Sequence, residues 1–525
     1  MDLSELEELI AYEVADKAIP SISYVLFDRD GVLAQRHVSQ SGNLLGDATR
    51  FRIGSISKTF AALLAIRLVE QGRLSLDGSV ADLLPGFKRS LTLRKLLSHR
   101  SGLTREATVG HYLDGGSPPL SETVASLREA RFKGAADGST YFYSNAGYAI
   151  VGRLVEIAAG RSYAQELGSA ILEPLGLNST AITLSPAIRA ALAAAKIWDL
   201  YGDGDAPLFD LGGAPAGNIY STLGDVARYG QMLLREGEGI VRAETLRRMW
   251  RPAGPDPATG YGLGFAVSTL DGRPQIGHGG VVYGYASSLQ LLPEAGLGLA
   301  MFSTLDFTSD LIGRLSRRAL RLALADRGMG ARPKPSRRLP RARLEEAQAL
   351  AGIYAAGDAG PHIEIVSAGS RLTLIDEGVP IEIRPIGQRR YVPDGRISGE
   401  ETSPALALQV RGNSLDWRGR EWRRVGDDFR QPIPGELMQF LGLYAPDFAP
   451  TQLYVSGGVL MCLIEYFCPH WCEPLGGNRF LMHGGLYEQE VLELGVAAAN
   501  GSPAIKVGEM TLPRIGKRWS QSPTN

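Results

Sequence analysis

The chain has 525 residues, which at roughly 150 residues per domain suggests about three domains. Its 55 basic and 56 acidic residues give a formal charge of −1, and this balance argues against binding to nucleic acid or to an anionic membrane. Three cysteines are too few for a disulfide scaffold. The acidic first residues lack the basic start and apolar block of a secretory signal, so we expect a cytoplasmic protein.

The first part of the chain has the pattern of an α+β domain. Segments with the periodicity of regular elements are, in chain order, 5–16 (helix), 21–27 and 32–37 (strands), 57–71 (helix), 286–292 and 297–303 (strands) and 311–325 (helix). Strands therefore lie near both ends of this region, with helices between and after them. We expect an α+β domain whose terminal segments share one antiparallel sheet.

A basic stretch separates this domain from the rest of the chain. Residues 327–343 contain seven Lys or Arg, three Pro and two Gly, and no acidic residue. This composition is typical of an exposed linker, and one short basic run on a neutral chain is weak support for a nucleic-acid site. The predicted first domain is 1–327 and the predicted linker is 328–345.

The rest of the chain contains an internal repeat with an offset of 90 residues. Residues 350–355 match 440–445, and 415–425 match 505–515. Between these anchors both copies alternate as strands do. We therefore expect two small antiparallel β-barrel or barrel-like domains. Their predicted ranges are 346–428 and 436–518.

The strongest chemical pattern is Ser-x-x-Lys, formed by Ser55 and Lys58 at the start of the predicted helix 57–71. A spacing of three on a helix places both side chains on one face. A buried or electropositive lysine can lose its proton near neutral pH and act as base toward the serine hydroxyl. The start of a helix also favours developing negative charge. An isolated Ser-x-x-Lys is mostly chance, so its meaning depends on other motifs.

Two further segments can complete such a site. Tyr143 and Asn145 lie in one short motif, where a phenol near a lysine ammonium can be partly ionised and shuttle a proton. The amide of Asn145 can hold the lysine and a substrate amide. The segment 275–284 contains His278 followed by two glycines, which would let a substrate lie against a strand edge. Its backbone N–H groups could form half of an oxyanion hole.

These three motifs in this order resemble those of the serine β-lactamase-related hydrolases, which include class C β-lactamases and penicillin-binding-protein-like enzymes. The stretches that agree are 51–60, 72–77, 96–103, 143–145, 216–222, 261–265 and 275–284, so the resemblance covers about residues 10–325. It implies a β-lactamase/transpeptidase-like fold. A catalytic domain followed by two barrel-like domains is similar to the D-aminopeptidase architecture, in which a loop of the last domain reaches the active site and limits substrate size.

The resemblance also implies a role for each motif residue and implies no metal or cofactor. The implied site residues are Ser55 (acylated nucleophile), Lys58 (general base), Tyr143 (proton relay), Asn145 (orientation of Lys58 and substrate), His278, and Gly279, Gly280 and Val281 (substrate and oxyanion binding). The oxyanion hole would be the backbone N–H groups of Ser55 and Val281. His278 stands where β-lactamases have a lysine that meets the substrate carboxylate, and a neutral or partly charged histidine suits a smaller or uncharged group.

We therefore expect a serine hydrolase that forms an acyl-enzyme and acts on short peptides or amides with D- or non-standard residues, such as linearised cyclic peptides. A carboxylesterase with the same residues is the first alternative. A β-lactamase, or a penicillin-binding sensor that acylates and stalls, is less favoured. The expected partner is a small peptide, amide or ester, and a homodimer is left open. A carboxylate near His278 would imply a free amine in the substrate, and an arginine would imply a carboxylate.

The three cysteines lie close together near the C-terminus, at Cys462, Cys468 and Cys472. The spacing Cys468-x-His470-x-Cys472 could suggest zinc, which takes Cys and His ligands. No Cys-x-x-Cys pair is present, and a cytosolic cysteine is usually a small apolar residue. We favour a structural or loop role over a metal or redox site.

Overall fold

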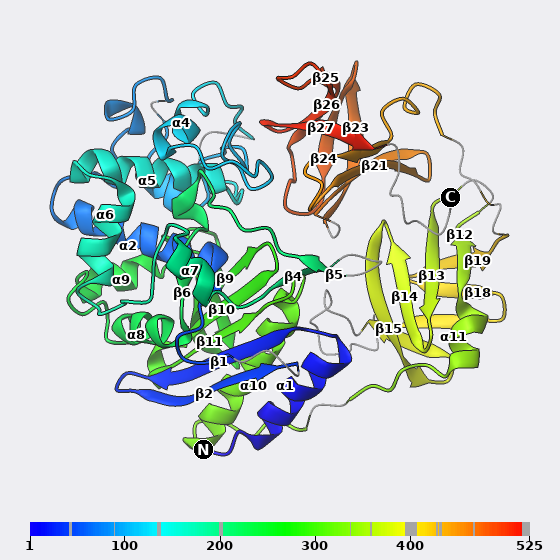
Figure 1. The fold of residues 1–525 in the computed structure, drawn as a ribbon, viewed down its shortest axis with the longest axis horizontal. Coiled ribbons are helices and arrows are strands. Elements are labelled where there is room, and N and C mark those ends of the chain that lie inside the picture. The colour runs from blue at the N-terminus through cyan, green and yellow to red at the C-terminus, as the bar shows by residue number, and fades with distance from the viewer. Residues whose placement is uncertain are drawn as a thin grey trace. The chain divides into compact units, whose positions relative to one another are not determined.

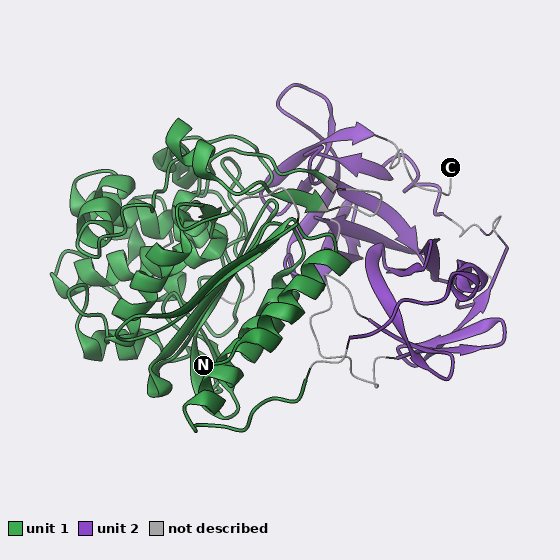
Figure 2. Cartoon of the chain, turned by 60° about the horizontal axis from the view of Figure 1, so that its bottom comes forward, with its two compact units in different colours: residues 1–198, 203–335 green, residues 199–202, 336–525 purple. Residues whose placement is uncertain are grey.

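The computed structural model describes residues 1–40, 45–88, 90–133, 138–198, 203–335, 338–357, 360–393, 407–426, 429, 433–465 and 468–516 (Figure 1). The described residues form two compact units, one of residues 1–198 and 203–335 and the other of the described residues from 338 onward (Figure 2). No helix in these ranges has both the length and the apolar character needed to span a bilayer. The predicted domain ends at 428 and 518 lie outside the described residues, and the domain boundaries stay predictions.

The first unit is built around one antiparallel sheet of seven strands. In sheet order these are β2 (Val32–Ser39), β1 (Ser21–Asp28), β11 (Leu297–Ser303), β10 (Tyr285–Leu292), β9 (Arg273–Val282), β8 (Ala266–Leu270) and β7 (Gly260–Tyr261) (Figure 1). Strand β1 pairs with β11, where Ile22 is opposite Ser303. Every residue of β11 is buried, which explains its continuous apolar sequence. The predicted sharing of one sheet by the two ends of this region is confirmed.

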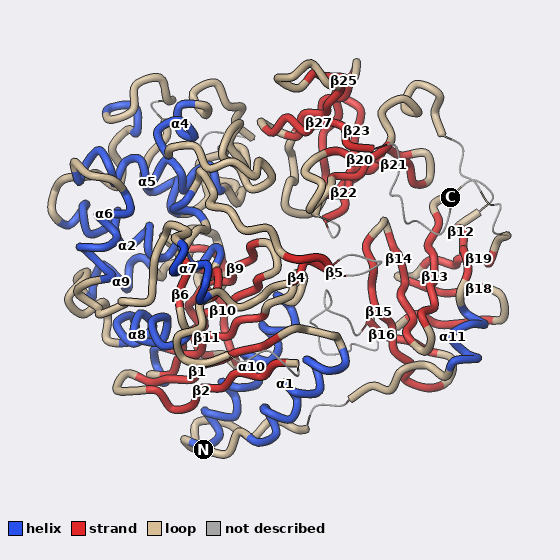
Figure 3. The backbone as a smooth tube through the Cα atoms, viewed as in Figure 1, coloured by secondary structure: helices blue, strands red, loops and turns tan. Residues whose placement is uncertain are grey.

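Helices lie on both faces of this sheet (Figure 3). The helices of the unit are α1 (Ser4–Asp16), α2 (Ser57–Glu70), α3 (Leu93–Leu97), α4 (Leu120–Ala125), α5 (Asn145–Ala159), α6 (Tyr163–Leu167), α7 (Pro186–Ala191), α8 (Leu223–Leu234), α9 (Ala243–Met249) and α10 (Ser309–Asp326). Helices α1 and α10 share a core with Leu26 and Met301 of the sheet. On the other face, α2, α5 and α8 share a larger core with Phe27 and Phe302. The helices predicted at 5–16, 57–71 and 311–325 correspond to α1, α2 and α10.

Short elements connect the sheet and the helices. They are β3 (Phe51–Arg52), β4 (Lys196–Trp198), β5 (Asp203–Asp205), β6 (Tyr220–Ser221), the 3-10 turns η1 (Gly54–Ile56), η2 (Val80–Asp82), η4 (Ala214–Ala216) and η5 (Pro293–Ala295), and the π-helical turn η3 (Gly168–Leu172). Strand β3 pairs with β6, where Arg52 is opposite Tyr220. This small ladder fixes the chain immediately before η1 and α2.

The stretch predicted as an exposed linker is exposed over most of its described length, but not at its end. Arg327 is the C-cap residue of α10 and forms an ion pair with Asp28 at 2.7 Å. Leu339 and Ala342 are buried, and Ala342 belongs to the core of the barrel that follows. The helix α11 (Leu344–Leu350) comes directly after them. The end of the predicted linker therefore packs with the first barrel, because its apolar residues are buried and Ala342 joins the core of that barrel.

The described residues of the second unit form two closed antiparallel barrels of eight strands each, which confirms the predicted pair of barrels. The first contains β12 (Gly352–Ala355), β13 (His362–Ala368), β14 (Arg371–Asp376), β15 (Val379–Gly387), β16 (Arg390–Pro393), β17 (Leu408–Arg411), β18 (Ser414–Trp417) and β19 (Arg420–Arg424). The second contains β20 (Gly442–Tyr444), β21 (Thr451–Ser456), β22 (Val459–Ile464), β23 (Cys468–Gly476), β24 (Arg479–His483), β25 (Val491–Ala497), β26 (Pro503–Val507) and β27 (Met510–Gly516). Burial alternates along strands such as β14 and β21, as one barrel interior requires.

The sequence repeat corresponds to the same side-chain contact in both barrels. The guanidinium of Arg424 donates to the main-chain oxygen of Ala349 at 2.8 Å. At the matching position of the second barrel, Arg514 donates to the main-chain oxygen of Gln439 at 2.7 Å. In each barrel the same arginine also donates to the carbonyl two residues further on. The repeated arginine therefore joins the last strand of each barrel to the segment that precedes its first strand.

Candidate active site

Ser55 lies at the turn between the short strand β3 and the long buried helix α2. It is partly exposed, whereas the residues around it are buried. Gly54 has φ +50°, and a Cβ atom there would lie 2.7 Å from the backbone nitrogen of Val281. Both the backbone conformation and this close approach require glycine. The turn therefore holds Ser55 directly against strand β9.

The amine of Lys58 is buried and makes three hydrogen bonds. Its Nζ lies 3.1 Å from Oγ of Ser55, 2.7 Å from Oδ1 of Asn145 and 2.7 Å from the main-chain oxygen of Ala216. These acceptors come from η1, from the first turn of α5 and from η4. The Lys58 side chain is inaccessible to solvent. The structure thus brings together the predicted Ser-x-x-Lys pair and the predicted asparagine.

The surroundings of Lys58 favour its neutral form. Burial lowers the pKa of Lys58 well below 10.5; the charge of Arg105 adds to this shift, and the charge of Glu106 opposes it. A neutral amine has a lone pair that can accept a proton from the hydroxyl 3.1 Å away. The pair has the geometry and the electrostatics of a nucleophile with its base.

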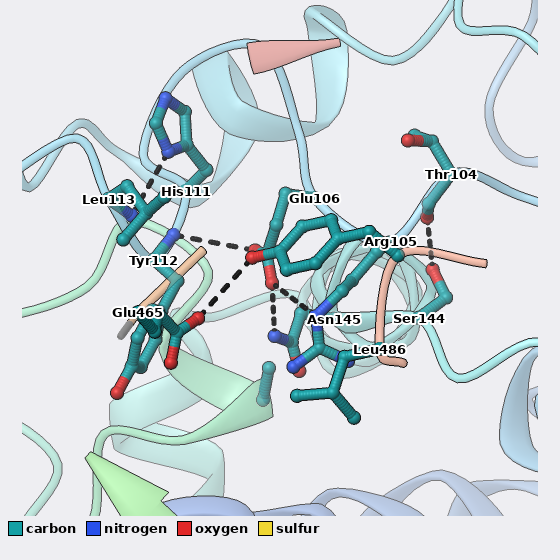
Figure 4. Close-up of polar contacts among 12 residues, drawn as sticks. Thr104, Arg105, Glu106, His111, Tyr112, Leu113, Ser144, Asn145, Glu465 and Leu486 are labelled. Carbon is teal, nitrogen blue, oxygen red and sulfur yellow. Dashed lines mark hydrogen bonds and ion pairs between the residues drawn. The ribbon is translucent and has the colours of Figure 1, made fainter. Parts of the chain in front are cut away.

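Glu106 holds the asparagine from the other side (Figure 4). Nδ2 of Asn145 donates to Glu106 at 2.5 Å, which leaves Oδ1 of Asn145 to accept from Lys58. The Glu106 carboxylate also accepts from the backbone nitrogen of Tyr112 at 3.4 Å and lies 3.6 Å from the Arg105 guanidinium. Burial raises the pKa of Glu106, and Arg105 and Asn145 oppose that shift. The carboxylate therefore fixes which way the Asn145 amide faces.

Tyr143 faces both members of the Ser-x-x-Lys pair. The Lys58 Nζ lies 4.8 Å from the centre of the Tyr143 ring, and Tyr143 is hydrogen-bonded to Ser55. Burial raises the pKa of Tyr143 above its ordinary value, although the Ser55 hydrogen bond and the charge of Arg105 oppose this. The raised pKa argues against the partial ionisation expected for a phenol near a lysine charge, because burial outweighs the charges that oppose it.

His99 fixes the position of Tyr143, a role that the sequence did not suggest. Its Nδ1 accepts from the backbone nitrogen of Ser144 at 3.0 Å, and its main-chain oxygen accepts from that of Phe142 at 2.8 Å. Its ring lies against that of Tyr143, with centroids 4.2 Å apart. His99 thus binds both chain neighbours of Tyr143 and packs on the phenol between them.

His278 lies in the same site, on strand β9. Its ring centroid is 6.4 Å from that of Tyr143. Its Nε2 is 2.8 Å from the hydroxyl of Tyr261, and its Nδ1 is 2.5 Å from the main-chain oxygen of Gly279. Burial, together with the charge of Lys58, lowers the pKa of His278 to about 3. The ring is therefore neutral at physiological pH.

The edge of β9 after His278 is open beside Ser55. The ladder between β8 and β9 ends at Gly277, while β10 pairs with β9 on the other side as far as Val282. Gly279 is exposed and Val281 is partly exposed. A Cβ atom on Gly280 would lie 2.1 Å from the main-chain oxygen of Ile53, so glycine is needed there too. The arrangement places the backbone of Val281 next to that of Ser55.

The sequence motifs did not identify two parts of this site, the Arg105–Glu106 pair and Tyr261. Arg105 and Glu106 follow a stretch that supports the family resemblance, but no spacing rule links them to Asn145. Tyr261 lies inside another such stretch, without an assigned role. All three are buried side chains that act on a predicted residue. In the sequence, the adjacent opposite charges of Arg105 and Glu106 and the glycines on both sides of Tyr261 are the features that could have drawn attention to these residues.

The cysteine segment lies on barrel strands rather than in a loop. Cys462 is on β22, and Cys468 and Cys472 are on β23; all three are buried thiols outside any disulfide between described residues. Sγ of Cys468 lies 3.3 Å from Nε2 of His470. In the described ranges, no group of three or more His, Cys, Asp or Glu side chains is placed to hold a metal ion. Of the expected structural or loop role, this placement on barrel strands supports the structural one.

Comparison with known proteins gives a family match over the first unit. Residues 6–323 match the family model described as Beta-lactamase. Penicillin-binding protein 4 of Amycolatopsis lactamdurans is 31% identical over 296 residues, which cover 51% of this chain and 77% of that protein. Matches to two other curated relatives, from Homo sapiens and Dictyostelium discoideum, span 64% and 59% of those proteins.

Solved structures share the fold at lower sequence identity. The octameric penicillin-binding protein homologue from Pyrococcus abyssi has a TM-score of 0.57 and 23% identity, covering 80% of this chain and 100% of that chain. The D-amino acid amidase from Ochrobactrum anthropi SV3, complexed with L-phenylalanine, has a TM-score of 0.54 and 23% identity, covering 62% and 98%. At these identities the likeness shows the fold alone.

Proposed function

Since this chain belongs to the Beta-lactamase family and is a serine hydrolase, we propose that it cleaves short peptides or amides containing D- or non-standard residues through an acyl-enzyme on Ser55. The observation that carries the proposal is the buried, three-fold hydrogen-bonded Lys58 amine 3.1 Å from the Ser55 hydroxyl. The amidase named among the similar structures supports this substrate class. The proposed site residues are those that the sequence resemblance implies, with Glu106 and His99 as positioning residues.

In the proposed acylation, Lys58 takes the hydroxyl proton of Ser55 while Oγ attacks the substrate carbonyl carbon. The developing oxyanion is held by the backbone N–H groups of Ser55 and Val281. As the C–N bond breaks, the leaving nitrogen receives a proton from neutral Tyr143. Tyr143 then recovers a proton from Lys58. The raised pKa keeps the phenol protonated at rest, so its proton is present when this step begins.

Deacylation uses the same groups in reverse. Lys58 accepts a proton from a water molecule as the water oxygen attacks the acyl carbon. The leaving Oγ of Ser55 takes the proton of Tyr143, and Tyr143 recovers a proton from Lys58. Glu106 is a buried carboxylate near these groups, but its oxygens accept from Asn145 and from the backbone of Tyr112. We therefore assign it to orienting Asn145 rather than to activating water.

The charges in the site are balanced. From the sequence, we expect a carboxylate near His278 to indicate a free amine in the substrate, and an arginine there to indicate a carboxylate. Glu106 and Arg105 are both present, 3.6 Å apart. Because they form an ion pair, neither is a free charge that alone selects one end of a peptide. Neutral His278 supports a substrate that presents an uncharged group to β9, which makes a β-lactamase or penicillin sensor the less favoured proposal.

The test compares wild type with Ser55→Ala on two sets of substrates. The first set contains D-aminoacyl amides and peptides with D-residues, and the second contains simple p-nitrophenyl esters. Wild type is expected to cleave the amides and peptides, and Ser55→Ala should lose turnover by about 10⁴-fold or more while keeping its circular dichroism spectrum. Intact-mass analysis should detect an acyl adduct on wild type alone.

Three outcomes would change the proposal. Wild-type-like turnover in Ser55→Ala would refute the nucleophile. Turnover of esters alone would replace the peptidase with the carboxylesterase. An adduct that persists for hours without turnover would indicate a penicillin-binding sensor instead.

A further inference from the structure

The two contacts of His278 define one tautomer of its ring. A carbonyl oxygen only accepts hydrogen bonds, so Nδ1, which lies 2.5 Å from the oxygen of Gly279, must bear the ring proton. In the neutral ring Nε2 then has a lone pair, and the Tyr261 hydroxyl 2.8 Å away must donate to it. The ring thus has neither a free N–H group nor a positive charge to offer a ligand.

We propose that Tyr261 is a specificity-determining positioning residue: its hydroxyl holds His278 in this neutral tautomer, so that the site favours substrates placing an uncharged group beside His278 over those placing a carboxylate there. The proposal rests on the hydrolase function proposed above, because it concerns the same substrate site. It assigns to Tyr261 no contact with reacting atoms.

The segment around Tyr261 is fixed by close packing. Tyr261 is buried, and its ring meets that of His278 edge-on at 87° with centroids 5.6 Å apart. A Cβ atom on Gly262 would lie 2.1 Å from the main-chain oxygen of Met249, in α9. A Cβ atom on Gly264, which has φ +88°, would lie 2.2 Å from the Cβ atom of Ala62 in α2. These glycines let the strand β7 pack tightly, so the Tyr261 hydroxyl has little freedom to leave Nε2.

The other ionisable groups that face His278 do not supply a positive charge in its place. They are Lys58 from α2, His99 after α3, and Tyr143 before α5, besides Tyr261 from β7. Burial lowers the pKa values of Lys58 and His99 well below their ordinary values and raises that of Tyr143. All three shifts favour the uncharged form. A substrate carboxylate beside His278 would therefore be desolvated without a matching donor.

Removing the Tyr261 hydroxyl should weaken this preference. In Tyr261→Phe the ring keeps its packing, but Nε2 loses its donor and can itself take a proton. A hydrogen bond to the neutral form disfavours the charged form, so its loss raises the pKa of His278. A protonated Nε2 can donate to a carboxylate through a charge-assisted hydrogen bond. The variant should gain affinity for anionic ligands, most strongly at low pH.

The first measurement is the nitrogen NMR spectrum of the full chain labelled with ¹⁵N-histidine, in which His278 is identified by its absence from His278→Gln. Wild type is expected to show neutral His278 protonated on Nδ1 from pH 5 to 8. In spectra extended to pH 4, the His278 ring of Tyr261→Phe should begin to take its second proton at a higher pH than in wild type, where its pKa is about 3. Tyr163→Phe is the matched control, since Tyr163 is a buried tyrosine of α6 whose hydroxyl has no hydrogen-bond partner among the described residues.

The second measurement is binding of acetyl-D-Ala-D-Ala and its carboxamide to Ser55→Ala, with and without Tyr261→Phe. The parent should prefer the carboxamide, and Tyr261→Phe should lower that preference progressively as the pH falls from 6 to 4, by up to about tenfold, the size of one charge-assisted hydrogen bond. The Tyr163→Phe control should leave the ratio unchanged. This readout needs no turnover, so failure of the hydrolase proposal shows separately, as inactive wild type.

An unchanged preference, or no binding of either peptide, would overturn the role of Tyr261 in specificity. A ring that is cationic or protonated on Nε2 in wild type, or a spectrum that Tyr261→Phe leaves unchanged, would overturn the assigned tautomer and with it the proposal.

Discussion

At the candidate active site several polar side chains bond to one another, whereas the side chains that close each barrel bond to the main chain. Lys58 contacts the side chains of Ser55 and Asn145, and Asn145 in turn contacts that of Glu106. In the second barrel the hydroxyl of Tyr444, like the guanidinium of Arg514, reaches a main-chain oxygen of the preceding segment. The first barrel repeats both contacts.

These two kinds of hydrogen bond should affect different properties: the bonds between side chains affect catalysis, and the bonds to the main chain affect stability. In a side-chain network, a change in one member alters the pKa or the orientation of the next. A side chain that bonds only to a carbonyl affects the local stability of the segment it holds, because a carbonyl has no proton to exchange. Substitutions in the two regions should therefore give different kinds of effect, and this can be tested from the strongest to the weakest.

The largest effect is expected for Lys58→Arg. Arginine keeps the positive charge and hydrogen-bond donors but cannot act as a base, so kcat/KM should fall by about 10³-fold or more. In wild type the neutral amine is the active form, so activity should be lost as pH falls through the pKa of Lys58, which lies well below 10.5. The measurement is kcat/KM against pH. Lys196→Arg, at an exposed ion pair with Asp205, is the control and should match wild type.

A smaller effect with a defined sign is expected for Glu106→Gln. The charge of Glu106 raises the pKa of Lys58, so removing it should lower that pKa further and shift the acidic limb of the kcat/KM profile to lower pH. Glutamine can still accept from Asn145, so the plateau should fall by less than about tenfold. A shift toward higher pH would contradict the network. Glu166→Gln, at a buried carboxylate of α6 paired with Arg161, should leave the profile in place.

The smallest effect, and one on stability alone, is expected for Arg514→Met. Losing its hydrogen bonds to three main-chain oxygens should reduce the free energy of unfolding of the second barrel by about 1 kcal/mol. Arg424→Met should cost less, because Arg424 is more exposed. Urea unfolding followed by tryptophan fluorescence measures both. If either variant changed kcat/KM of the folded enzyme, the separation between the two regions would not hold.

Local spacing explains which parts of the site the sequence could predict. Ser55 and Lys58 are one turn apart, so their contact follows from local geometry, and strands at both ends of the first region were enough to predict a shared sheet. Glu106 lies 39 residues from Asn145, and Tyr261 lies 17 residues from His278. No local rule links such pairs, because only the tertiary fold brings them together. The raised pKa of Tyr143 could not be predicted for a related reason: the burial that raises it is a property of the whole fold.

The main-chain oxygen of Ala216, which accepts from Lys58, has a consequence for how this enzyme can vary between relatives. A backbone acceptor is present whatever side chain occupies position 216, so mutation of that residue cannot delete it. Asn145, by contrast, can be lost by one nucleotide change. Lys58, the proposed general base, therefore has one hydrogen-bond acceptor that does not depend on the side chain at its position and one that selection must maintain. Sequence drift at the asparagine should weaken the positioning of Lys58 without leaving the amine wholly unanchored.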